Sequence, residues 1–97
     1  MSKVYISGKV TGLSNYKAIF EEAEKKLRAL GLMPVNPVKN GEVLGWKWED
    51  YMKDDIKLLC DCDYIYQLEN WEESEGAKFE YEVAKTLGIP ILEVKLV

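Results

Sequence analysis

Hydrophobic residues follow two different periods along the chain, and the period changes several times. Short apolar runs rich in β-branched and aromatic residues predict four strands, at residues 3–7, 32–35, 62–68 and 89–94. Between these runs, apolar residues recur at steps of three and four, which predicts helices at residues 14–31, 46–59 and 74–88. Strands that alternate with helices in this way favour a parallel sheet with right-handed crossovers.

The predicted fold is therefore a small three-layer α/β sandwich of the flavodoxin-like or Rossmann-like kind, with a parallel sheet of four or five strands. Pro34 has no backbone N–H to donate, so the strand that contains it is expected at an edge of the sheet or limited to a few paired residues. The first helix is expected to be capped by Ser14 or Asn15. A length of 97 residues fits one domain, residues 1–97.

Composition narrows the possible functions. The formal net charge of −4, from 13 basic and 17 acidic residues, disfavours binding to a nucleic-acid polymer or to an anionic membrane surface. No apolar run approaches the roughly 20 residues that a membrane span needs, and the expected location is cytoplasmic. The chain has no histidine, which excludes serine–histidine and cysteine–histidine catalysis. Acid–base chemistry then falls to carboxylates, tyrosine, lysine or cysteine.

No metal site or cofactor is predicted. Cys60 and Cys62 lie one residue apart, too close to staple the fold, and without histidine they make a poor metal site beside Asp61 and Asp63. They are interpreted as packing residues.

The third predicted helix carries the most informative residue. It begins at Ser74, a good N-cap, and ends at Gly88, which can adopt the left-handed conformation that closes a helix. Glu80 falls inside its apolar stripe, three residues before Val83 and four before Ala84. A carboxylate among small and apolar residues loses hydration, so a site that tolerates this cost commonly binds a partner or performs chemistry. Alternatively, Glu80 reaches water at the border of the stripe or pairs with a lysine.

Other candidates follow the first two strands. Ser7, Gly8, Lys9, Thr11 and Gly12 form a glycine-bearing turn after the first strand, an opening typical of phosphate- or nucleotide-binding α/β domains. Their spacing matches neither G-x-G-x-x-G nor the P-loop, so a plain strand-to-helix turn stays an alternative. Asn36 follows the second strand, where ligand contacts are common in parallel sheets.

The second helix adds a further acid and two aromatic residues. Asp55 borders the apolar stripe, whereas Asp54 points away from it. Trp46 and Trp48 can form an aromatic wall for a base or sugar, or a hydrophobic lid or dimer contact. Strand ends and helix starts meet along one edge of a parallel sheet, so Asp55 and Glu80 are expected to face one cleft. Two acids beside a phosphate-binding loop suggest cleavage of a glycosidic bond.

The ordered combination of these residues resembles a known family. It consists of Tyr5-Ile6-Ser7-Gly8 with Gly12, then Asp55 with Asp63, then Ser74-x-Gly76-x-x-x-Glu80-x-x-x-Ala84. In order and spacing it is similar to the nucleoside 2-deoxyribosyltransferase superfamily and to its deoxynucleoside 5′-monophosphate N-glycosidases. The resemblance implies that Glu80 is the nucleophile that attacks C1′, that Asp55 handles the proton of the departing base, and that Tyr5 orients the glutamate.

The resemblance also implies how the substrate is held. The loop from Gly8 to Gly12 and Ser74 would contact the sugar-phosphate end of a small deoxynucleoside or deoxynucleotide, and Ser7 and Gly76 are further candidates for substrate binding. A serine at the position of Ser74 favours 5′-monophosphates, because a hydroxyl at a helix N-terminus accepts an anion. The acidic loop before it, with Glu69, Glu72 and Glu73, works against phosphate affinity. Family active sites are often completed by a neighbouring subunit, so a homodimer or larger homo-oligomer is implied.

Two other functions remain open at this point. The same scaffold can serve as a non-catalytic nucleotide or ADP-ribose-type sensor, in which Glu80 only hydrogen-bonds a sugar hydroxyl. A third interpretation is an interaction module that uses the surface of Trp46 and Trp48.

Overall fold

The computed structural model describes residues 2–95, and these residues fold as the alternating pattern predicts. In chain order the elements are β1 (Lys3–Ser7), α1 (Tyr16–Ala29), β2 (Met33–Val35), α2 (Trp48–Cys60), β3 (Tyr64–Gln67), the 3-10 helix η1 (Trp71–Glu73) and α3 (Glu75–Leu87). The α/β fold class is confirmed. The 3-10 helix lies in a segment that was predicted to be a loop.

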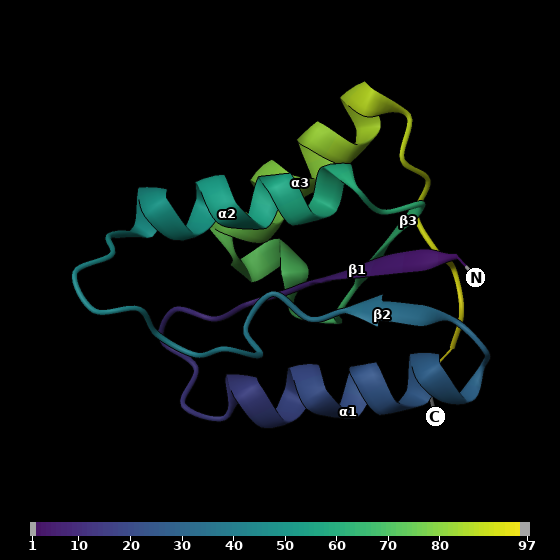
Figure 1. Ribbon diagram of the computed structural model, residues 1–97, viewed down its shortest axis with the longest axis horizontal. Helices are drawn as coiled ribbons and strands as arrows, with labels where there is room; N and C mark the ends of the chain where they lie inside the picture. The colour runs from purple at the N-terminus through teal and green to yellow at the C-terminus, as the bar shows by residue number, and fades with distance from the viewer. Residues whose placement is uncertain (1, 96–97) are drawn as a thin grey trace.

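The three strands form a parallel sheet in the order β2-β1-β3. Figure 1 shows α1 covering one face of this sheet and α2 with α3 covering the other, so the molecule has three layers. The short strand β2 stands at an edge and pairs with β1 only, as the proline at position 34 indicated.

The sheet of residues 2–95 has three strands rather than the predicted four or five. Residues 89–94 run beside β3, but they form one parallel bridge, between Ile65 and Ile91. The backbone carbonyl of Pro90 accepts from the Ile65 N–H, and the Leu92 N–H donates to the Ile65 carbonyl. Pro90 has no N–H of its own, so the ladder cannot extend through this residue.

The central strand β1 is buried on both faces, and its alternation divides the core in two. Val4 and Ile6 point to the layer of α1, whereas Tyr5 points to the layer of α2 and α3. Ser7, two residues after Tyr5, lies on the same face as Tyr5. This alternation is what allows two polar side chains of one strand to reach one residue of α3.

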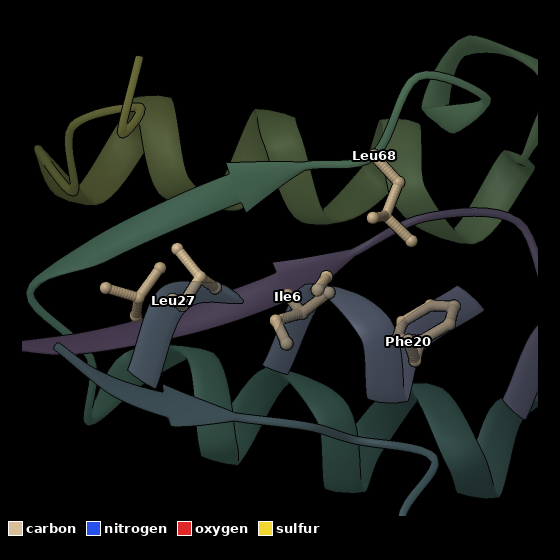
Figure 2. Close-up of a cluster of buried hydrophobic side chains, with 6 residues drawn as sticks. Ile6, Phe20, Leu27 and Leu68 are labelled. Atoms are coloured by element: carbon tan, nitrogen blue, oxygen red, sulfur yellow. The ribbon is translucent and has the colours of Figure 1, made fainter. Parts of the chain in front are cut away.

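Two apolar clusters hold the layers together. The cluster under α1 contains Val4, Ile6, Phe20, Ala23, Leu27 and Leu68. Figure 2 shows Ile6 of β1 between Phe20 and Leu27 of α1, with Leu68 above them. The cluster under α2 and α3 contains Tyr5, Leu59, Cys62, Ile65 and Ala84. Each fully buried large apolar side chain contributes about 1.5–3 kcal/mol to stability, so these clusters fix the layers between which the site lies.

The caps predicted from the sequence for the helix ends are only partly observed. Ser74 caps α3, because its Oγ accepts from the Ala77 N–H at 3.1 Å, and Gly88 ends the helix with a φ of 72°. Asn15 occupies the N-cap position of α1, but its side chain makes no capping hydrogen bond. Leu30 and Leu87, which are apolar residues, are exposed. Both stand at the end of their helix, where the chain turns.

Gly8 is required by packing at the end of β1. A Cβ atom at this residue would lie 2.5 Å from Leu68 Cδ1 and 2.9 Å from Leu68 Cβ. We predict that Gly8→Ala lowers the free energy of unfolding by about 1–3 kcal/mol, because the core must shift to admit the methyl group. Chemical denaturation measures this effect.

The control is the same substitution in a Leu68→Ala background, which removes the contacts with Cδ1 and Cγ but keeps the Cβ atom of residue 68. There Gly8→Ala is expected to cost less than in the wild-type background. An equal cost in both backgrounds would show that contact with Leu68 is not the cause.

Candidate active site

Glu80 is the buried acid around which the site is built. It lies on the inner face of α3 with 4% of its surface exposed. Tyr5 Oη donates to Glu80 Oε2 at 2.6 Å, and Ser7 Oγ donates to Glu80 Oε1 at 2.6 Å. Each carboxylate oxygen therefore has one hydroxyl donor, and both donors come from the same face of β1. The alternative that Glu80 reaches bulk water does not hold.

The surroundings of Glu80 change its acidity. Burial raises the pKa of Glu80 from 4.5 to about 7, and the hydrogen bonds from Ser7 and Tyr5 oppose this rise because they favour the ionised form. Burial, then the charge of Glu80 and that of Asp55, raise the pKa of Tyr5 well above its ordinary value. Tyr5 is therefore a hydroxyl donor at every physiological pH.

Asp55 is the second acid of the site. It lies partly buried on α2, in the wall of the same cleft as Glu80. Burial, followed by the charges of Glu80 and Asp54, raises the pKa of Asp55 from 3.8 to about 8. The negative charge of ionised Glu80 favours the protonated form of Asp55, so near neutral pH the pair favours one carboxylate and one protonated acid. One acid is then fit for nucleophilic attack and the other for proton donation.

The two acids face a cleft of about 700 Å³, within the usual range for a small-molecule site. Its walls come from the loop after β1, the segment between β2 and α2, α2 itself and the start of α3. The residues predicted from the sequence that line it are Gly8, Thr11, Gly12, Trp48, Asp55, Ser74, Gly76 and Glu80. Parts of the chain that are far apart in sequence thus meet as expected.

Two predicted binding residues are turned away from the cleft. The Asn36 amide donates to Glu24 Oε1 at 3.2 Å, and its Oδ1 accepts from the Val38 N–H. Asn36 therefore lies against α1, in a separate hollow of about 320 Å³. There it joins Arg28 and Lys39 as a partner of the Glu24 carboxylate, which is 13% exposed. The Lys9 side chain is likewise turned away, and its Nζ pairs with Glu73 Oε1 at 3.3 Å.

Three other predicted binding residues, Ser7, Gly76 and Ser74, make structural contacts within the protein. Ser7 was predicted to bind substrate, but it is 1% exposed and its hydroxyl lies on Glu80. A Cβ atom at Gly76 would lie 3.0 Å from Met52 Sδ, so the close approach of α2 and α3 favours glycine there. Ser74 lines the cleft while its Oγ caps α3.

Sequence reasoning missed Tyr51. Its hydroxyl accepts from the Val43 N–H at 2.8 Å and lies 3.2 Å from the Val43 carbonyl. Its ring packs edge-on against Trp46, with ring centroids 5.1 Å apart. Tyr51 thereby holds the segment before α2, of which Gly41, Glu42 and Trp46 line the cleft. The signal was present in the sequence, since Tyr51 lies four residues before Asp55 and shares its helix face.

Neither a metal centre nor a membrane span is found in the described part of the chain. Residues 2–95 contain no group of three or more acidic or cysteine side chains placed to hold a metal ion. Cys62 is buried, and its Sγ lies 3.3 Å from the Leu58 carbonyl, whereas Cys60 is exposed. Over the same residues, no helix has the length and apolar character needed to cross a bilayer.

Comparison with known proteins places the chain in a family. Residues 2–93 match the model of a family described as "Domain of unknown function (DUF4406)". The chain belongs to the DUF4406 family. No curated protein matches its sequence.

Solved structures place this DUF4406 domain in a known fold. It is similar to the 2-deoxyribosyltransferase of Bacillus psychrosaccharolyticus, with a TM-score of 0.72 and 24% identity over 93% of this chain and 69% of that one. It is also similar to a 2-deoxyribosyltransferase of Leishmania mexicana, with a TM-score of 0.71 and 22% identity over 95% of this chain and 63% of that one. The predicted resemblance is confirmed for the fold, and these structural neighbours are deoxyribosyltransferase enzymes.

The burial of Glu80 gives a prediction for stability against pH. Because the folded pKa of about 7 exceeds the unfolded value of 4.5, Glu80 contributes stability below about pH 4.5 and loses it as the pH rises through 7. Glu80→Gln removes this loss. At pH 8.5 the variant should unfold about 5 °C or more above the wild type, and at pH 5 the difference should shrink.

Thermal unfolding by circular dichroism at the two pH values measures this effect. The control is Glu82→Gln, because Glu82 is exposed on the same helix. A Glu80→Gln difference that is the same at both pH values would show that the carboxylate is not buried as described.

Proposed function

We propose that this DUF4406 domain cleaves or transfers the N-glycosidic bond of a deoxynucleoside or its 5′-monophosphate. One observation carries the proposal. Glu80 is buried, and both of its carboxylate oxygens accept hydroxyl hydrogen bonds, yet it still forms part of the wall of a small-molecule cleft together with Asp55. Burial raises the pKa of Glu80 and makes its ionisation costly. Buried acids with raised pKa values are concentrated at functional sites, so this environment favours a catalytic role over a purely structural one.

In the first step the Glu80 carboxylate attacks C1′ of the sugar. A Glu80 O–C1′ bond forms while the bond from C1′ to the base nitrogen breaks, and the electron pair of that bond goes to the base. Asp55 donates its proton to the departing base, which leaves neutral. Tyr5 and Ser7 keep the carboxylate in one orientation, so little reorganisation is needed at the moment of attack.

In the second step an acceptor attacks C1′ from the face that the base has left. The acceptor is water in hydrolysis or a second base in transfer, and the ionised Asp55 takes its proton. The Glu80–C1′ bond breaks and the carboxylate is restored, so the configuration at C1′ is retained.

Two further features support a nucleoside as substrate. Trp46, Trp48 and Tyr51 all line the cleft, and aromatic side chains are suitable surfaces for stacking a planar base. The fold is that of 2-deoxyribosyltransferases at low sequence identity.

The direct test is release of free base from each deoxynucleoside and deoxynucleoside 5′-monophosphate, followed by chromatography. Glu80→Gln should lower the rate by at least about a thousandfold because it removes the nucleophile. Asp55→Asn should lower it by about 10²–10⁴-fold because it removes the proton donor. Glu82→Gln serves as the matched control and should keep the wild-type rate.

Two outcomes would count against the proposal. Base release that survives in Glu80→Gln would exclude Glu80 as the nucleophile. Tight binding of a nucleotide without any turnover would instead favour a non-catalytic sensor on the same scaffold.

The two raised pKa values also predict how activity depends on pH. Activity needs ionised Glu80, with a pKa of about 7, and protonated Asp55, with a pKa of about 8. The profile of kcat/KM against pH should therefore be a narrow bell with its maximum between these values. In Asp55→Asn the alkaline limb should disappear. A flat profile between pH 5 and 9 would contradict these assignments.

A further inference from the structure

The side chains that line the cleft include acidic groups but no basic group, within the part of the chain that the structure describes. Glu42, Asp55 and Glu80 line it, and among residues 2–95 no lysine or arginine does so. A substrate with a 5′-phosphate would bring up to two further negative charges next to these carboxyl groups. Like charges at close range disfavour binding and confer specificity.

Several lysines neighbour cleft-lining residues in sequence, among them Lys9, Lys17 and Lys47, and the one in the loop after β1 is bound elsewhere. Lys9 lies in the loop after β1, between Gly8 and Val10, which both line the cleft. Its Nζ instead lies 3.3 Å from Glu73 Oε1, and its backbone N–H donates to Asn70 Oδ1 at 3.0 Å. Both donors of Lys9 are therefore held by the segment that precedes α3.

The short helix η1 fixes the position of these two acceptors. Asn70 is its N-cap residue, and the Glu73 N–H donates to the Asn70 carbonyl. Trp71 anchors η1 on α3, because its ring packs against Tyr81 with centroids 5.2 Å apart. Glu73 therefore belongs to a 3-10 helix that is packed against α3.

The start of α3 does not replace the missing cation. Ser74 Oγ already accepts the Ala77 N–H. A helix N-terminus attracts anions, but Glu72, Glu73 and Glu75 surround this one. Their negative charges oppose the attraction.

We propose that Glu73 is a specificity-determining residue: by holding Lys9 away from the cleft, it restricts the site to N-glycosides with an uncharged 5′-hydroxyl group. This inference rests on the proposed function and narrows it to nucleosides over 5′-monophosphates. It runs against the expectation that Ser74 by itself would favour phosphorylated substrates.

The test compares each deoxynucleoside with its 5′-monophosphate, with kcat/KM measured for the wild type, Glu73→Gln and Glu72→Gln. The wild type should prefer the nucleoside at least about tenfold. Glu73→Gln should shift the ratio towards the monophosphate about two- to fivefold, because it frees the flexible Lys9 side chain. Glu72→Gln removes the same charge from the same turn without freeing Lys9, so its shift should be smaller. The double variant Lys9→Gln/Glu73→Gln should lose the gain.

The outcomes separate this inference from the proposed function. A wild type that cleaves monophosphates faster than nucleosides overturns the inference and leaves the proposed function standing. Equal shifts in Glu73→Gln and Glu72→Gln overturn the role of Glu73. If no substrate is cleaved, the proposed function fails. In that case calorimetry measures the binding of thymidine and thymidine 5′-monophosphate to the wild type and the same variants. A wild type that binds the monophosphate more tightly overturns the inference.

Discussion

The site depends on one contact between two layers, the pair of hydrogen bonds that Tyr5 and Ser7 donate to Glu80. A carboxyl group buried without partners would be costly to the fold. Here the two hydroxyls satisfy both oxygens at 2.6 Å, and they can do so because every second residue of β1 faces α3. The same bonds that make burial of the acid tolerable also fix its orientation at the cleft.

The rest of the structure supports this contact from two sides. The apolar cluster under α1 holds β1 in place, and the cluster around Tyr5, Ile65 and Ala84 sets the distance from β1 to α3. Met52 packs against Gly76, which brings α2, and with it Asp55, close to α3. The acid pair is thus positioned by core packing, and stability at neutral pH is lowered because both acids prefer their protons when buried.

The sequence predicted the fold class, the strand–helix order and the position of Glu80 on the buried face of its helix, because these follow from local periodicity and from one polar residue in an apolar stripe. It could not count the strands, since Pro90 reduces residues 89–94 to a single bridge. It also misplaced Asn36 and Lys9, whose partners Glu24 and Glu73 are set by tertiary packing and not by sequence distance. Side-chain direction in loops depends on such partners, and no local pattern reports them.

The most direct measurement is the titration of the Glu80 carboxyl carbon by NMR in protein labelled with ¹³C-glutamate, assigned by its loss in Glu80→Gln. The structure predicts a midpoint near pH 7, because burial raises the pKa of Glu80 to about 7. Removal of the hydroxyl donors in Tyr5→Phe or Ser7→Ala should raise the midpoint further. A midpoint near the ordinary value of 4.5, unchanged in those variants, would contradict a buried Glu80 held by two hydroxyls.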